Sequence, residues 1–267
     1  MTAFIELVAI AIRAMRRAIF WWSLGLAAIV AVTVAFWPAF KGSSGISSAI
    51  DQLPGGLVQA LGLENFDTPA GYLRGNLYDL LIPLLLAFAA ITLAVGQTAG
   101  EESNGRLELL LSQPLDHRLV FIARAIAVLI ALIVMTAVMA VTQVVVDGLV
   151  GLQIDSALLL PTIVLCALLG LLHGGIALAV AGRSARPPTA MGLAAVIAFA
   201  GYIVAALFPL VSSLAAWRQL SPWSWAFGGD PLLTQTDPWR YLALALPAIA
   251  LTALGVELFG KRDIAAA

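Results

Sequence analysis

Charge is what this sequence has least of. Only 11% of its 267 residues are charged and 61% are hydrophobic, whereas soluble domains are about 25% charged and about 45–50% apolar. Charge at the centre of a membrane span costs on the order of 2.5–3.5 kcal/mol. Five runs lack charged side chains and are long enough to cross a hydrocarbon core of about 30 Å: 18–40, 80–100, 125–146, 157–182 and 189–217. These runs exclude a water-soluble domain and indicate a lipid environment.

Basic surface, cysteine and histidine are also scarce. The net charge is −1, so no overall basic field draws in nucleic acid. The single cysteine, Cys166, cannot form an intrachain disulfide. With two histidines, His117 and His173, and no CxxC or HExxH motif, a catalytic metal site is not expected. The sequence therefore predicts neither a metal nor another bound cofactor.

The motifs of nucleotide and acyl chemistry are missing as well. No G-x-x-x-x-G-K-[ST] loop is present to bind nucleotide phosphates, and no G-x-S-x-G motif presents a serine nucleophile. An intramembrane enzyme needs ionisable groups on facing helices, and the apolar runs contain only His173. The same scarcity disfavours a proton-coupled secondary transporter.

The apolar runs predict an all-α polytopic membrane protein, with one transmembrane domain over residues 1–267. The sixth span is short, because only Tyr241–Val256 is uncharged, but Arg240 and Glu257 can extend to opposite interfaces. Six spans are expected, at 18–38, 77–98, 121–146, 157–182, 189–211 and 241–259.

The segments between the spans have their own patterns. In residues 1–17 apolar residues recur at helical spacing on one face and the arginines lie mostly elsewhere, which predicts an amphipathic helix lying on the membrane surface. The outer loop 39–76 predicts short amphipathic helices. The outer loop 212–240 is rich in tryptophan, which indicates either anchoring at the interface or a short re-entrant helix.

Basic residues set the orientation of the six spans. With the amino terminus inside, the inner segments hold ten of the 14 lysines and arginines and the outer segments hold four. Inner loops of membrane proteins carry the excess of positive charge. Both termini are therefore expected in the cytoplasm, in a multi-pass protein of the cell membrane.

Three polar residues inside the spans are candidates for a translocation path. His173 lies in the middle of the fourth span, where an ionisable group is often functional. Its alternative role is a neutral imidazole that packs against a neighbouring helix, with Gly174 and Gly175 allowing close approach. Gln143 and Thr142, near the outer end of the third span, either line a cavity or mark the interface.

The inner loop at 99–118 concentrates charge in a chain that otherwise avoids it. Leu107, Leu110 and Leu111 repeat at helical spacing until Pro114, which predicts a short amphipathic helix at the cytoplasmic mouth of the bundle. The acidic pair before it suits a helix amino terminus. Such a helix is a lever that a cytoplasmic partner can grip, or simply a solvated loop helix.

This segment resembles the coupling segment of ABC transporter permeases of the type-2 exporter class. The pattern is Glu101-Glu102-x-x-Gly105-x-Leu107-Glu108-x-Leu110-Leu111-Ser112-x-Pro114-x-x-x-Arg118. Weaker similarity lies in 71–85, which enters the second span, and in the ending Phe259-x-Lys261-Arg262-Asp263. Arg124 stands where such permeases more often have lysine.

The resemblance implies partners and roles that the residues alone do not. Such permeases pair with a second copy or a paralogue, and separate ATPase subunits bind ATP and grip the coupling segments. The ATPase contact would be made by Glu101, Glu102, Gly105, Arg106, Glu108, Pro114 and Arg118, unless the acidic pair bonds within the permease.

The expected function is export of an amphipathic, lipid-like or antibiotic-type small molecule, driven by ATP hydrolysis in a partner chain. The alternative is a membrane scaffold or assembly factor that binds an ATPase without transporting anything. Stimulation of ATP hydrolysis by a candidate cargo separates these two hypotheses.

Overall fold

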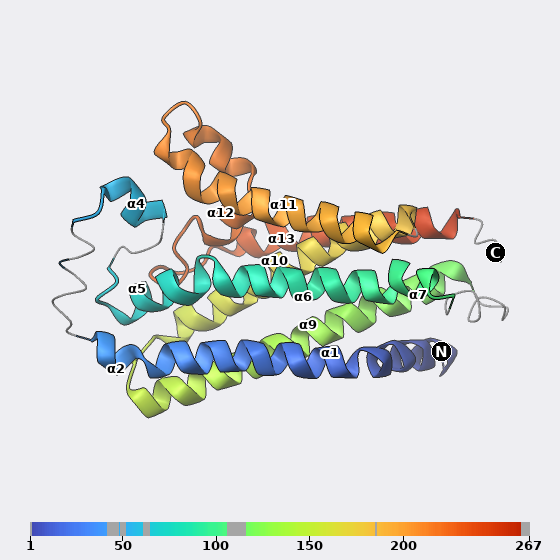
Figure 1. Cartoon of the computed structure of the whole chain (residues 1–267), viewed down its shortest axis with the longest axis horizontal. Helices are drawn as coiled ribbons and strands as arrows, with labels where there is room; N and C mark the ends of the chain where they lie inside the picture. The colour runs from blue at the N-terminus through green and yellow to red at the C-terminus, as the bar shows by residue number, and fades with distance from the viewer. Residues whose placement is uncertain are drawn as a thin grey trace.

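The computed structural model describes residues 2–41, 48, 52–60, 65–105, 116–184 and 186–262. Within these ranges the regular structure is helical, and no strand is present. The long helices run along a common axis, and α1 (Thr2–Ala35) begins and α13 (Pro238–Gly260) ends at the end of the bundle where α7 (Ala99–Ser103) lies (Figure 1). The short helices α2 (Trp37–Phe40), α4 (Gly55–Ala60) and α5 (Pro69–Leu73) lie at the other end, which the charge bias predicts to be the outer one.

Six helical segments of the described residues are long and apolar enough to span a membrane, as the sequence predicts. The third and fourth spans are the uninterrupted helices α9 and α10, whose amino termini are capped by the side chains of Asp116 and Asp155. The segments are Phe4–Phe40, Pro69–Ser103, His117–Val150, Ser156–Arg183, Pro187–Leu210 and Pro238–Gly260. The all-α polytopic fold is thereby confirmed.

The amino-terminal segment differs from the prediction of a separate surface helix at 1–17. Helix α1 (Thr2–Ala35) is continuous through that boundary. It packs along α9, with Leu7, Ala11 and Met15 buried on one face. These residues recur every four positions, so they form one stripe of the helix. The face of Leu7, Ala11 and Met15 is thus covered by protein while Ile5 stays exposed, and no glycine or proline interrupts the helix where the break was expected.

The second span begins earlier than residue 77 and is jointed. Its outer part is α5 (Pro69–Leu73), which Thr68 caps by accepting a hydrogen bond from the Gly71 amide. A π-helical turn, η1 (Arg74–Tyr78), follows, and α6 (Leu81–Gln97) begins after Leu80, whose φ of −135° and ψ of −56° are not helical. Tyr72 is buried in an aromatic cluster with three other rings, those of Trp37, Phe40 and Phe66. The burial of this entry segment explains why it belongs to the span.

The sixth span is longer than its uncharged stretch. Helix α13 (Pro238–Gly260) starts at a proline after Asp237 and has 23 residues, or about 35 Å, which is enough to cross the hydrocarbon core. The Arg240 guanidinium donates hydrogen bonds to the carbonyl oxygens of Ser224 and Trp225, at 3.3 and 2.9 Å. Its charge is thus stabilised by helix α12 at the outer end of the span.

Helix α10 (Ser156–Arg183) is the centre of the bundle, because it packs along both α6 and α13. Small residues bring the backbones together at these crossings. A Cβ added to Gly170 would lie 3.1 Å from the Leu86 carbonyl oxygen of α6, and one added to Gly255 of α13 would lie 2.8 Å from the Leu178 carbonyl oxygen. Close backbone approach through small residues is typical of helix packing in lipid.

The outer end of the bundle is closed by short helices. These are α2 (Trp37–Phe40), α4 (Gly55–Ala60), η2 (Phe208–Leu210), η3 (Ala215–Leu220) and α12 (Pro222–Phe227). Helix α12 packs against α10, α11 (Pro187–Leu207) and α13, and it buries Trp223 against the ring of His173 at 5.4 Å between centroids. The second outer loop therefore contains short helices, and its two interpretations, anchoring at the interface and a re-entrant helix, both stay predictions.

Candidate functional site

The predicted cytoplasmic end of the second span carries the acidic pair. Helix α7 (Ala99–Ser103) follows a sharp turn at Thr98, and Glu101 and Glu102 stand in its first turn. Glu101 lies 3.7 Å from the guanidinium of Arg124 on α9 (His117–Val150), which also donates a 2.6 Å hydrogen bond to the Gln97 carbonyl oxygen. Arg124 is buried. One arginine therefore ties the end of α6 and the start of α7 to α9.

Glu102 is held by a second arginine at the carboxyl end of the chain. The Arg262 guanidinium forms a bidentate pair with the Glu102 carboxylate, one arm of which measures 3.2 Å. Arg262 also donates to the Ala181 carbonyl oxygen of α10 at 3.4 Å, and it lies over the ring of Phe259. The side chains of Glu102 and Arg262 are only 11% and 20% exposed. The pair joins α7 to the ends of α10 and α13 in a mostly dry environment.

The far end of the predicted coupling segment is fastened to the same helix. The Arg118 guanidinium donates a 3.0 Å hydrogen bond to Glu257 of α13. These side chains are 46% and 51% exposed, so water screens this pair more than the pair of Glu102. The stem of Arg118 passes over Gly260, where a Cβ would clash with it. Both ends of the segment 99–118 are thus tied to α13.

Gly105 ends α7 with a φ of +70°, a conformation in which glycine carries no steric penalty. Of the seven residues assigned to ATPase coupling, the structure therefore places Glu101, Glu102, Gly105 and Arg118. Arg106, Glu108 and Pro114 lie outside the described residues, so their predicted role stays a prediction. The sequence analysis did not name Arg124, Glu257 or Arg262 as site residues. The usable signal was that Glu101 and Glu102 need basic partners when they are buried, and Arg124 and Arg262 are such partners.

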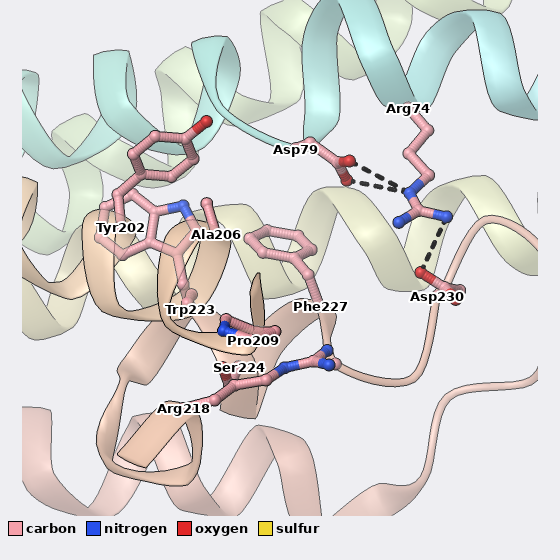
Figure 2. Close-up of a pocket in the computed structure, with 12 residues that line it drawn as sticks. Arg74, Asp79, Tyr202, Ala206, Pro209, Arg218, Trp223, Ser224, Phe227 and Asp230 are labelled. Carbon is pink, nitrogen blue, oxygen red and sulfur yellow. Dashed lines mark hydrogen bonds and ion pairs between the residues drawn. The ribbon is translucent and has the colours of Figure 1, made fainter. Parts of the chain in front are cut away.

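A polar cavity of about 210 Å³ lies at the outer end of the bundle, between the π-turn, α11 and α12 (Figure 2). Arg74 binds Asp79 and Asp230 at 3.1 Å each, and so links the second span to the connection between α12 and α13. Figure 2 shows the rings of Tyr202 and Phe227 beside this ionic group. We name this space the outer cavity.

The three residues predicted for a translocation path do not line the outer cavity. His173 is fully buried, and its Nδ1 contacts the Leu169 carbonyl oxygen at 2.8 Å. Gln143 is also fully buried and bridges Tyr78 and Asp147 by hydrogen bonds of 3.4 and 2.9 Å. The Thr142 hydroxyl donates to its own helix, to the Val138 carbonyl oxygen. In this conformation all three have packing roles, and a role in transport stays a prediction.

In the part of the chain that the structure describes, no group of three or more His, Cys, Asp or Glu residues could hold a metal ion. The cluster of carboxylates and guanidiniums around α7 is suited to holding a segment in place, since each charge meets an opposite one.

A family described as "ABC-2 family transporter protein" matches residues 8–264, which is nearly the whole chain. A comparison with curated proteins finds no match.

Proposed function

The chain belongs to the ABC-2 transporter family and is a membrane subunit of an ABC transporter, and on that premise we propose that it is the permease of an ATP-driven exporter. It pairs with a second permease copy or a paralogue, and separate ATPase subunits bind and hydrolyse the ATP. The observation that carries this proposal is the attachment of both ends of the segment 99–118 to α13.

The attachment supplies a route for mechanical force. An ATPase that grips the segment moves α7 and the start of α9 together. The pair Glu102–Arg262 then pulls on the end of α13, and Arg118 pulls on Glu257 one turn earlier. Arg124 links the same movement to α6. The acidic pair therefore acts inside the permease, as an anchor of the lever, and residues 106–115 supply the surface that the ATPase touches.

The cargo proposed is an amphipathic, lipid-like or antibiotic-type small molecule. The spans are apolar, and two of the polar side chains deep inside them, Gln143 and His173, contact polar groups of the bundle itself. The cytoplasmic placement of both termini is supported by the charge bias and by their position at the end of the bundle that holds α7 (Figure 1).

Reconstitution with an ATPase tests the proposal. The permease and a candidate ATPase from a neighbouring gene are placed in proteoliposomes, and ATP hydrolysis and cargo movement are measured together. An exporter gives ATP-dependent movement and hydrolysis that rises with cargo, whereas a scaffold binds the ATPase with neither. Hydrolysis by the purified permease alone, or the failure of any ATPase to co-purify, contradicts the proposal.

A charge exchange tests the anchor specifically. Glu102→Lys places like charges beside Arg262 and should abolish transport while membrane insertion is retained. The exchange Glu102→Lys with Arg262→Glu restores an opposite pair and should recover transport. Transport by the single variant at the level of the unaltered protein contradicts a role for this pair in coupling.

A further inference from the structure

An apolar groove of about 390 Å³ lies between α9, α10 and α13, with part of α6 at its base. Its volume falls in the range of small-molecule sites, which in helical proteins often lie between helices. Apolar side chains of α9 and α13, such as Ile126, Leu129 and Val256, line it. We name this space the inner groove, because it ends at Glu257 near the cytoplasmic cluster.

The inner groove opens on the side of the bundle. Ile122, Leu129 and Ile249 line it and are exposed on the side of the bundle. Its deep wall is made by Gly174 and Gly175, where α10 touches α6 and α13 closely enough that an added Cβ would meet neighbouring atoms at 3.1 and 2.9 Å. These two glycines let α10 lie close against α6 and α13 and form the floor of the groove, which is open on its other side.

Glu257 is the only charged residue among those that line the inner groove. Its Oε2 accepts the hydrogen bond of Arg118, and within the described residues its Oε1 has no hydrogen-bond partner. A carboxylate oxygen therefore stands at the cytoplasmic end of an otherwise apolar space. An anionic headgroup placed there would meet like charge, and a neutral apolar molecule would leave the carboxylate unused.

We propose that the inner groove is a binding site for an amphipathic organic cation, with its apolar body between α9, α10 and α13 and its positive charge beside Glu257. This inference rests on the proposed function and names the substrate class for it. Arg118 competes with the ligand for the same carboxylate. Because Arg118 also ends the coupling segment, a movement of that segment that withdraws the arginine strengthens the site, and its return weakens it.

Direct binding to the full chain in lipid nanodiscs tests the site without any ATPase. Tetraphenylphosphonium and tetraphenylborate are probes of similar shape and opposite charge. The cation should bind saturably and the anion should not. Glu257→Gln should weaken cation binding by roughly two- to fivefold, the range for a half-exposed charge pair. Arg118→Gln should tighten it by a similar factor, an opposite sign that damage to the fold would not produce.

A steric pair of variants locates the ligand. Ala253 lines the groove and Ala250, on the same helix, does not, although both are exposed. Ala253→Leu should reduce cation binding at least tenfold, and Ala250→Leu should leave it unchanged. Equal effects of the two leucines, equal binding of the two ions, or unchanged binding in both charge variants overturns the proposal.

Two further outcomes separate this inference from the function on which it rests. Cation binding in the inner groove without any ATP-driven movement contradicts the exporter and leaves the site standing. ATP-driven export that is indifferent to Ala253→Leu contradicts the site and leaves the exporter standing. Cross-linking of Ala253→Cys to its counterpart in a second copy would place protein in the groove and overturn the proposal.

Discussion

The ion pair between Glu102 and Arg262 is expected to contribute measurably to the free energy of unfolding. Two unit charges about 4 Å apart attract by about 4 kcal/mol at an effective dielectric constant of about 20. Desolvation removes part of this gain, but the side chains are 11% and 20% exposed, so the loss of one partner leaves a charge in a dry site. We expect Glu102→Ala and Arg262→Ala each to lower the free energy of unfolding by about 2–3 kcal/mol.

The double variant should lower that free energy by only about 3 kcal/mol, which corresponds to a coupling energy of about 2 kcal/mol. Denaturant unfolding in mixed micelles, followed by tryptophan fluorescence, measures the unaltered protein, the two single variants and the double variant, which together form a double-mutant cycle. The pair Arg118–Glu257 provides a matched control, because it joins the same segment to the same helix but is about half exposed. Its coupling energy should stay below about 1 kcal/mol. Equal coupling energies for the two pairs, or strict additivity at Glu102 and Arg262, would refute the role assigned to burial.

Three further predictions concern packing and topology. Gly182→Ala puts a methyl group against the backbone of α13 and should lower the free energy of unfolding by about 1–3 kcal/mol. Gly192→Ala adds a Cβ that meets nothing within 4 Å, so it should raise the free energy of unfolding by up to about 1 kcal/mol. Thermal unfolding in detergent compares the two variants. Cysteine placed at Ser184 should react with an impermeant maleimide only from the cytoplasm, and at Gln219 only from outside; labelling from the opposite sides would reverse the topology. His173→Leu should change the free energy of unfolding by less than about 1 kcal/mol, because Nε2 has no hydrogen-bond partner among the described residues, and it should keep at least roughly half of the transport rate; complete loss of transport would assign this imidazole a direct role.

The spans could be predicted from the sequence because the requirement that makes them is local. A segment must be apolar over about 20 residues wherever its neighbours lie. The same reasoning predicted a sixth span, and helix α13 extends beyond the uncharged stretch at both ends. It misplaced the start of the second span, because the burial of Tyr72 depends on aromatic rings from α2 and from residue 66.

The continuation of α1 through residue 17 was not predicted, for a related reason. The pattern of residues 2–17 fixes an apolar stripe and a basic stripe but does not say whether lipid or protein covers the first. Helix α9, which covers it, lies more than 100 residues further along the chain.

The sequence predicted some of the residues of the candidate site but not the ion pairs that they form. Glu101, Glu102 and Arg118 were recognised from a local motif. Their partners are Arg124, Arg262 and Glu257, and Glu102 lies 160 residues from Arg262. Such pairs depend on how α9, α10 and α13 cross, which no local pattern specifies.

The π-turn of the second span limits how far a displacement of its inner end can travel. Helix α6 has 17 residues and is a rod of about 25 Å, and the non-helical Leu80 interrupts it from α5. We expect α6 to tilt about this joint while Arg74 keeps the segment beyond it tied to Asp230. A displacement of the end at α7 would then move the inner half of the span and leave its outer half in place.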